Sequence, residues 1–502
     1  VGGRGTTYDA NHIDYTYAHI DGGPNNPGYF TDKNAPVSDD IIQFADANVK
    51  AICVNNWDTD GDGELSKAEA ANVISLDNAF TGNKDITSFD EFQYFVGVIA
   101  LGSREFGGCY NLSSIILPPN LKSLEAESLN GNKIDELTIP ASVTSIEPSA
   151  LYATYKNIFV EEGNAYFSSI DGVLFNKDIT KIVTYPERKE AESYEIPNTV
   201  VTIGRCAFYS SELKSVTIPY GVNTIEGSAF RYCGNLESID IPGSVETIGY
   251  DNFEFANSLT TATIPSSVKS IDTGVFASCQ NLQEIIVDTN NQYYTSVDGV
   301  LYTKDKTHLV TYPAGKPDEN VVIPNYVTSI GQCGVYGCNN IKSVVIPRRV
   351  ESIGWFAFVN CANLNSVTTH RKKPLELTKT FDDRAQQNGT LYVPYGTKEL
   401  YQAADEWNGF QNIVELDPSA IISLVNNGDM EGEDNGNFVV RTNYSSGNEE
   451  PVQAAISNGV GVNGSRGIKV EATSKLAVSW DNQFWVRYNE SMPANTKLKI
   501  SC

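Results

Sequence analysis

The chain has few of the residues from which most catalytic sites are built. It has 502 residues but only two methionines and four histidines, which are His12, His19, His308 and His370. The histidines are scattered, and no His-Glu-x-x-His, Gly-x-Ser-x-Gly or Walker sequence is present. Zinc-dependent hydrolysis, serine-type acyl transfer and nucleotide hydrolysis therefore lack their usual residues. We expect a protein that is not an enzyme.

Basic residues are also scarce. There are 36 lysines and arginines against 62 aspartates and glutamates, so the net charge is −26. Because nucleic acids and anionic membrane surfaces are bound by clustered lysine and arginine, we expect no nucleic-acid partner. No stretch of about 18 apolar residues occurs, so no transmembrane segment is expected. Val1 follows no signal peptide, and we expect a mature or trimmed start with the surface anchor upstream of residue 1.

The chain does contain a repeat of 22 to 23 residues, which its prolines mark most clearly. Pro197, Pro219, Pro242 and Pro265 follow one another at intervals of 22, 23 and 23 residues. Valine recurs three residues after these prolines, isoleucine six after and phenylalanine eleven after, as in Phe230, Phe253 and Phe276. A period this short predicts stacked coils and not a globular core.

Each repeat has the pattern of a short strand followed by a turn. A segment of the form Leu-x-x-Ile-x-Ile alternates in hydrophobicity and ends at a proline, which cannot continue a hydrogen-bonded ladder. A single coil cannot bury its apolar face, whereas stacked coils can. The pattern therefore predicts a solenoid whose ends need caps.

Two inserts of matching sequence interrupt the repeat. They run from Asn164 and from Asn291, and each contains an Asp-Gly pair between alternating apolar and aromatic residues. This pattern predicts a β-hairpin. The aromatic residues of the inserts are candidate ligand contacts, although packing of the hairpin is the alternative role; they are Tyr166, Phe167, Tyr293 and Tyr294.

The pattern Ile-Pro-x-x-Val-x-x-Ile-Gly-x-x-Ala-Phe-x-x-Cys, with its Asp-Gly-Val-Leu inserts, resembles the BspA-like leucine-rich repeats of bacterial surface proteins. The resemblance spans residues 82–416, and the segment around Trp407 and Phe410 is similar to the closing cap of such arrays. It implies a leucine-rich repeat solenoid displayed on the surface of a bacterium or outside it. Some members of the family adhere to host matrix proteins, so the resemblance also implies adhesion.

Four of the nine cysteines keep the same phase of the repeat. Cys233, Cys279, Cys338 and Cys361 each lie fourteen residues after a repeat proline. Cys338 and Cys361 should lie about one strand spacing apart, roughly 5 Å, which a disulfide can span. The alternative, which the odd count favours, is a ladder of buried thiols that pack as small apolar residues.

Residues 58–69 fit the twelve-residue calcium loop of the EF-hand. Gly63 takes the sharp turn at position 6, and an acidic or hydroxyl residue stands at every ligand position. The predicted Ca²⁺ ligands are Asp58, Asp60, Asp62, Glu64, Ser66 and Glu69. Asp46 should cap the preceding helix, and Ser66 with Glu69 should form a capping box. Because no second loop is present, we expect residues 38–81 to form a small helical calcium unit that stabilises the start of the solenoid.

After Pro418 the repeat stops, and short alternating segments separated by Gly and Asn turns indicate strands. Residues 419–502 are similar to the start of jelly-roll carbohydrate-binding modules, which implies a partial β-sandwich. Trp480 and Trp485 are candidate sugar contacts, with core packing as the alternative. Residues 1–37 show no period and are expected to be irregular.

Two functions remain open. The first is a non-catalytic adhesin whose solenoid binds host or bacterial surface proteins. The second is a surface glycan-binding protein in which the C-terminal module contacts polysaccharide and the solenoid is a spacer.

Overall fold

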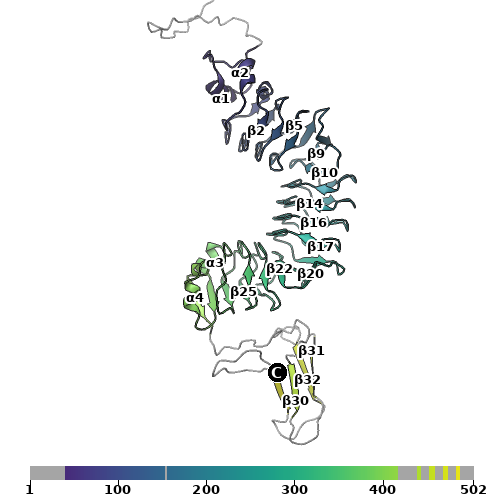
Figure 1. The fold of residues 1–502 in the computed structure, drawn as a ribbon, viewed down its shortest axis with the longest axis vertical. Coiled ribbons are helices and arrows are strands. Elements are labelled where there is room, and N and C mark those ends of the chain that lie inside the picture. The colour runs from purple at the N-terminus through teal and green to yellow at the C-terminus, as the bar shows by residue number, and fades with distance from the viewer. Residues whose placement is uncertain are drawn as a thin grey trace, which may run out of the picture. The chain divides into compact units, whose positions relative to one another are not determined.

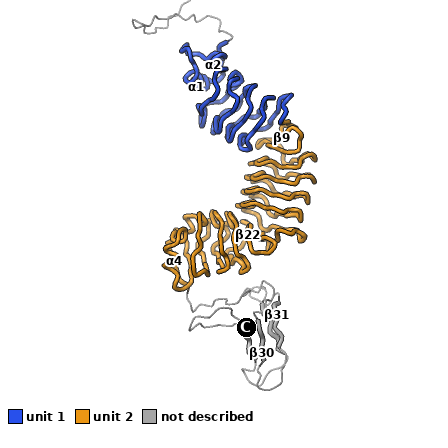
Figure 2. The backbone as a smooth tube through the Cα atoms, in the orientation of Figure 1, with its two compact units in different colours: residues 1–166 blue, residues 167–502 orange. Residues whose placement is uncertain are grey.

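The computed structural model describes residues 40–152 and 155–416, and beyond them the backbone of four strands between residues 438 and 486. The chain separates into two compact units, residues 1–166 and 167–502 (Figure 2). The irregular segment predicted for residues 1–37 lies outside the described residues. In total the chain winds about 14 turns of about 23 residues, which confirms the predicted solenoid.

Unit 1 begins with helices α1 (Ala47–Trp57) and α2 (Lys67–Asn72), followed by the 3-10 helix η1 (Asp90–Tyr94) (Figure 1). Its coils carry strands of two to four residues that pair in parallel, in the orders β1-β3, β2-β4-β6 and β5-β7. The strands of successive coils therefore form two stacked rows, which we call the two walls of the solenoid. The bounds are β1 Ser88–Phe89, β2 Ala100–Leu101, β3 Ser114–Ile115, β4 Ser123–Leu124, β5 Glu136–Ile139, β6 Ser145–Ile146 and β7 Asn157–Val160.

An aromatic core fastens the helices of unit 1 to its first coils. The ring of Trp57, at the end of α1, lies 5.5 Å from that of Phe95, and Phe80 lies 5.1 Å from both Phe89 and Phe106. The four phenylalanines are fully buried. Such ring pairs are worth about 0.5–1.5 kcal/mol beyond the area they bury. The packing therefore makes the helical segment part of the solenoid's core.

Unit 2 continues the two-walled arrangement. One wall is the seven-stranded sheet β18-β16-β14-β12-β10-β9-β8, and the other holds the orders β11-β13-β15 and β17-β19. The bounds are β8 Phe167–Ile170, β9 Val173–Asn176, β10 Lys181–Thr184, β11 Ser193–Glu195, β12 Thr202–Ile203, β13 Ser215–Thr217, β14 Thr224–Ile225, β15 Ser238–Asp240, β16 Thr247–Ile248, β17 Thr261–Ile264, β18 Ser270–Ile271 and β19 Glu284–Val287.

The second part of unit 2 repeats this plan after the second insert. Its walls are the five-stranded sheets β20-β21-β22-β24-β26 and β23-β25-β27-β28-β29. The bounds are β20 Tyr294–Val297, β21 Val300–Thr303, β22 His308–Thr311, β23 Asn320–Val322, β24 Ser329–Ile330, β25 Ser343–Ile346, β26 Ser352–Ile353, β27 Ser366–Thr369, β28 Thr390–Val393 and β29 Asn412–Glu415.

The strand register reproduces the sequence repeat residue by residue. Ile203 pairs with Ile225, and Ile225 with Ile248, so equivalent side chains of successive coils lie directly above one another. Phenylalanines of the repeat stack in the same way: the rings of Phe230 and Phe253 lie 5.4 Å apart and are inclined by 6°. The core of these coils is therefore built from columns of equivalent side chains.

Both inserts form the predicted hairpins, in which β8 pairs antiparallel with β9 and β20 with β21. Asp171 and Asp298 lie at the tips with φ near 49°, a left-handed conformation that Asp tolerates better than most residues. Each hairpin then joins a wall of unit 2, the first through β10 and the second through β22. The inserts thus extend a wall and do not break the solenoid.

The eight cysteines of the described residues are free thiols, which supports the ladder and not the disulfide between Cys338 and Cys361. The thiols also contribute hydrogen bonds. Cys233 donates to the carbonyl of Phe208 at 3.0 Å, and Cys279 donates to that of Phe253 at the same distance. Each of these thiols therefore donates a hydrogen bond to a buried carbonyl of the preceding coil.

The solenoid ends in a compact helical segment formed by α3 (Asp383–Asn388), α4 (Lys398–Gln402) and the 3-10 helix η2 (Trp407–Gly409). Tyr401, Trp407 and Phe410 are buried there, and the indole of Trp407 donates to the carbonyl of Leu375 at 2.9 Å. Beyond it, β30 (Phe438–Thr442) pairs antiparallel with β33 (Asn482–Val486), and β31 (Val452–Ser457) with β32 (Gly467–Ala472). Most of residues 419–502, Trp480 included, lie outside the described residues.

Candidate functional site

The predicted calcium loop joins α1 to α2, and both helices begin as the sequence indicates. The carboxylate of Asp46 caps α1 by accepting from the backbone N–H groups of Asn48 and Val49. Ser66 and Glu69 form a complete capping box at the start of α2. Gly61 and Gly63 have φ of 76° and 84°, so the tight turn requires residues without a Cβ atom. The backbone therefore has the helix–loop–helix course of a calcium loop.

Three of the six predicted ligands already converge. Carboxylate oxygens of Asp58, Asp60 and Glu69 all lie within 4.8 Å of one another. Asp58 is held by the backbone N–H groups of Gly61 and Gly63, which donate to its two oxygens at 2.7 and 2.9 Å. Three carboxylates this close repel one another in the absence of a cation. The arrangement suits a hard cation that prefers oxygen ligands.

The other three predicted ligands point elsewhere. Oδ1 of Asp62 accepts from the N–H of Glu64 at 2.8 Å, and the hydroxyl of Ser66 donates to Glu69 at 2.9 Å. The side chain of Glu64 forms an ion pair with Lys50 at 2.6 Å. This ion pair is compatible with Glu64 at position 7 of the loop. A residue at that position binds the ion through its backbone carbonyl, so its side chain can have another partner.

Glu69 is the most strongly hydrogen-bonded of the carboxylates. Its Oε1 accepts from the N–H and the hydroxyl of Thr59 at 2.7 and 2.8 Å, and its Oε2 accepts from Ser66. The hydrogen bond from the Ser66 N–H, with those from Thr59, lowers the pKa of Glu69 to about 2. The glutamate is therefore ionised at neutral pH.

No sequence pattern indicates how the loop is attached to the chain before it. The N–H of Ile42 donates to the carbonyl of Leu65 at 2.9 Å, and that of Lys67 donates to Asp40 at 2.7 Å. Leu65 is fully buried. In EF-hand pairs a second loop pairs with the first, whereas here the segment around Ile42 pairs with this single loop. Asp46 also accepts from the N–H of Thr87 at 2.6 Å, which ties α1 to the first coil.

The candidate contact residues of the inserts differ in exposure. Tyr166 is 53% exposed and Tyr293 is 49% exposed, whereas Phe167 is half-buried and Tyr294 is buried. The hydroxyl of Tyr294 accepts from the N–H of Ile271 at 2.8 Å, so this residue serves hairpin packing. The side chains of Trp480 and Trp485 lie outside the described residues.

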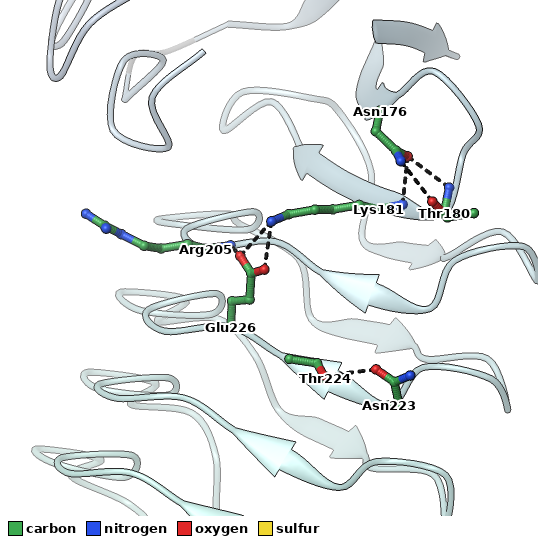
Figure 3. Close-up of polar contacts among 7 residues, drawn as sticks. All are labelled: Asn176, Thr180, Lys181, Arg205, Asn223, Thr224 and Glu226. Carbon is green, nitrogen blue, oxygen red and sulfur yellow. Dashed lines mark hydrogen bonds and ion pairs between the residues drawn. The ribbon is translucent and has the colours of Figure 1, made fainter. Parts of the chain in front are cut away.

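Several cations on the walls are paired with carboxylates of a neighbouring coil. Figure 3 shows Lys181 of β10 reaching across β12 to Glu226, whose two oxygens lie 2.7 and 2.8 Å from Nζ. Glu226 also accepts from the N–H of Arg205, while Asn176 and Thr180 close the turn before Lys181. Lys214 and Lys269 are paired in the same way with Glu192 and Glu246. The charges of these three lysines are therefore neutralised by carboxylates within the solenoid.

A family model described as the BspA type leucine rich repeat region matches residues 76–188, 184–296 and 315–384, with six copies. These segments make up more than half of the chain. The chain belongs to the BspA-type leucine-rich repeat family. Proteins of this family are generally non-catalytic. No curated protein sequence matches the chain.

Several solved structures are similar to this chain. The pneumococcal vaccine antigen PcpA is 21% identical, with a TM-score of 0.36, and the match covers 64% of this chain and 66% of that one. A leucine-rich cell surface protein from Faecalibacterium prausnitzii is 23% identical, with a TM-score of 0.27 and coverage of 56% and 62%. A leucine-rich repeat protein from Eubacterium ventriosum is 20% identical, with a TM-score of 0.38 and coverage of 58% and 75%. The match thus spans just under two thirds of the first two chains.

No helix in the described part of this BspA-type chain is both long and apolar enough to cross a membrane. The solved structures that resemble it include a bacterial cell-surface protein. These structures are similar to the chain in fold alone, and the similarity does not identify a ligand or a partner.

One cluster of charged residues differs from these surface ion pairs because its glutamate is buried. The side chain of Glu254 is 8% exposed and lies 2.5 Å from Nη2 of Arg231, which also lies 3.8 Å from Asp251. Burial raises the pKa of Glu254 to about 7, because it outweighs the attraction of Arg231. Burial also raises the pKa of Asp251. The cluster faces Tyr336 and Cys333 from a later coil.

We predict that Glu254 makes stability depend on pH. Its pKa is about 7 in the folded protein against 4.5 for a free glutamate, so its contribution to stability is full below pH 4.5 and falls as the pH rises to 7. The loss is at most about 3 kcal/mol. Glu254→Gln should therefore make the free energy of unfolding, measured by urea titration, less dependent on pH between 4.5 and 7. Glu246→Gln, which removes an exposed glutamate, serves as the control; equal slopes for both variants would contradict the prediction.

Proposed function

We propose that this BspA-type protein is a non-catalytic extracellular binding protein whose solenoid adheres to host or bacterial surface proteins. The observation that carries the proposal is the matched display of Tyr166 and Tyr293. In each insert an asparagine fixes the tyrosine to the coil. Nδ2 of Asn291 donates to the carbonyls of Pro265 and Val268, both at 2.9 Å, and its Oδ1 accepts from the N–H of Tyr293 at 2.8 Å.

Asn164 has the same role beside Tyr166. Its Nδ2 donates to the carbonyls of Pro140 and Val143 at 2.9 and 3.1 Å, and its Oδ1 accepts from the N–H of Tyr166 at 2.8 Å. Both asparagines are buried, with 1% and 0% exposed. A large aromatic side chain that is exposed on a fixed backbone loses little conformational freedom on binding. Tyrosine is enriched at the energetic centres of protein interfaces for this reason.

The proposal is tested with the double variant Tyr166→Ser/Tyr293→Ser and a panel of purified host matrix proteins. If these tyrosines anchor a partner, affinity measured by surface plasmon resonance should fall at least about tenfold, since anchors contribute about 2 kcal/mol or more each. The matched control is Tyr110→Ser/Tyr220→Ser, which removes tyrosines that are 52% and 81% exposed. Unchanged binding by the first variant would refute the role of the inserts.

We further propose that residues 58–69 bind Ca²⁺ through Asp58, Asp60, Asp62, Ser66, Glu69 and the carbonyl of Glu64. The bound ion would offset the repulsion of the converging carboxylates and fix α1 relative to α2. The role is structural, because a sensor would need a paired loop and a methionine-rich groove. The chain has two methionines in all.

The alternative function is glycan binding by residues 419–502, with the solenoid as a spacer. The antiparallel pairing of β30 with β33 and of β31 with β32 favours it, because jelly rolls are built from such strand pairs. Under this alternative, Trp480→Ala/Trp485→Ala should abolish capture on a glycan array, while Tyr166→Ser/Tyr293→Ser should leave it unchanged. The opposite pattern would reject it.

A further inference from the structure

A cationic turn near the end of the solenoid differs from the rest of this acidic chain. Residues 341–375 contain six basic residues and one acidic residue, Glu351, although the whole chain carries a net charge of −26. Five of the basic residues follow two neighbouring strands, β25 and β27. We name them the cationic turn: Arg348, Arg349, Arg371, Lys372 and Lys373.

The two halves of the cationic turn are in contact. Val345 of β25 pairs with Thr368 of β27, and Arg348 and Arg371 each lie three residues further along. Nη1 of Arg371 donates to the carbonyls of Arg348 and Val350 at 3.0 and 2.6 Å. The guanidinium therefore lies on the neighbouring turn. Since adjacent strands are about 4.8 Å apart, the cations gather within a small area.

Three cations of the cationic turn are not neutralised within the described part of the protein. Among the described residues, Arg349, Lys372 and Lys373 form no ion pair, and all three are exposed. By contrast, Lys342 of the same coil is paired with Glu319 at 2.6 Å. Nε of Arg371 is buried and has no acceptor within the described part of the chain. The turn therefore has exposed positive charge that is available to an anion.

The backbone of the cationic turn is held in place by the closing helical segment. The hydroxyl of Tyr401 in α4 donates to the carbonyl of Arg371 at 2.8 Å, and the indole of Trp407 donates to that of Leu375 at 2.9 Å. Tyr401 and Trp407 are both buried. The turn is thus fixed between the preceding coil and this segment, which reduces the ordering cost of binding.

An exposed aromatic ring lies at the equivalent place on the next coil. Thr368 pairs with Tyr392 of β28, and Tyr395 lies three residues after Tyr392, as Arg371 lies three after Thr368. Tyr395 is 68% exposed. A flat ring next to several cations suits a ligand that has both apolar faces and repeated negative charges.

We propose that the cationic turn and Tyr395 bind a sulfated glycan chain. Guanidinium groups match the geometry of sulfate oxygens as they match phosphate and carboxylate, and the tyrosine ring can stack on a pyranose. The site crosses two or three coils, and in the sequence Glu351 and Glu376 follow the two basic runs. A thin, flexible chain fits such a short site, whereas duplex DNA or an anionic membrane would extend beyond it over a chain with a net charge of −26. This inference rests on the proposed binding function but uses a different surface from the insert tyrosines.

The test uses the full chain and a heparin hexasaccharide, with affinity measured by calorimetry. Arg349→Gln/Lys372→Gln/Lys373→Gln should lower the affinity at least about tenfold, and it should reduce the salt dependence between about 50 and 200 mM because fewer counterions are released. Tyr395→Ala should lower it several-fold. The matched control is Lys122→Gln/Lys133→Gln/Lys306→Gln, which removes three exposed lysines elsewhere and should leave the affinity unchanged.

Three results would overturn the proposal. The first is equal heparin affinity for the cationic-turn variant and the lysine control. The second is equal affinity for the sulfated and the fully desulfated hexasaccharide. The third is tighter binding of a polyglutamate peptide, duplex DNA or phosphatidylserine vesicles than of the hexasaccharide. If the insert-tyrosine variant loses protein binding but keeps heparin affinity, the two surfaces act independently.

Discussion

Replacing Phe253 with alanine is expected to lower the free energy of unfolding by about 3–5 kcal/mol. The ring is fully buried and lies between two others, 5.4 Å from Phe230 and 5.2 Å from Phe276, inclined by 6° and 8°. Its removal opens a cavity in the middle of a column that the neighbouring coils cannot easily close. Because a solenoid is stabilised through contacts between neighbouring coils, the unfolding transition should also broaden.

Phe255→Ala is the matched control, since it removes the same side chain two residues away in the same coil. Phe255 is half-buried, and its ring stacks on that of Tyr232 at 4.8 Å on the surface. We expect a loss of about 1 kcal/mol, the usual size for a single substitution. Urea unfolding followed by circular dichroism measures both variants. Equal losses would show that the column of phenylalanines has no special role in stability.

Removal of calcium is expected to lower the melting temperature by several degrees. If the dissociation constant is about 10 µM and calcium is about 1 mM, binding adds about 2.7 kcal/mol to stability. The effect should be confined to unit 1, which contains Asp58, Asp60 and Glu69. Differential scanning calorimetry with and without a chelator, and with magnesium in place of calcium, measures it. An unchanged melt would reject the calcium assignment.

A double variant separates loss of the ion from loss of hydrogen bonds. Asp60→Asn/Asp62→Asn keeps the side-chain oxygens that accept from the N–H groups of Asp62 and Glu64 at 3.0 and 2.8 Å, but it removes two ligand charges. We expect it to melt like the wild type in chelator and to gain little from calcium. Asp85→Asn/Glu136→Gln removes two exposed charges of unit 1 outside the loop and should respond to calcium as the wild type does.

The solenoid was predictable because its sequence signal is repeated. The intervals between Pro197, Pro219 and Pro242 equal the spacing at which equivalent strand residues pair, as Thr202 does with Thr224. The hairpins were predictable for a similar reason, since each Asp-Gly pair lies at a tip. A local pattern that recurs in register fixes both the element and its neighbour.

Parts of the binding surfaces were not predictable. The tyrosines Tyr293 and Tyr294 are adjacent in sequence, yet one is exposed and the other is buried, because successive residues of an extended chain face opposite sides. The cationic turn is visible in the sequence as two basic runs, which begin 23 residues apart at Arg348 and Arg371. What sequence spacing does not show is whether a carboxylate of another coil neutralises them.

By itself, the sequence determined the period, the coil stack and the helix caps around residues 58–69. These follow from local patterns whose physical requirements, such as a cap at Asp46 or a bend at Gly63, are met within a few residues. Only the tertiary structure decided which cations are paired, which tyrosines face solvent and how Tyr401 and Trp407 hold the turn at Arg371. Those properties depend on contacts between coils, where the partner of a side chain lies 20 residues or more away.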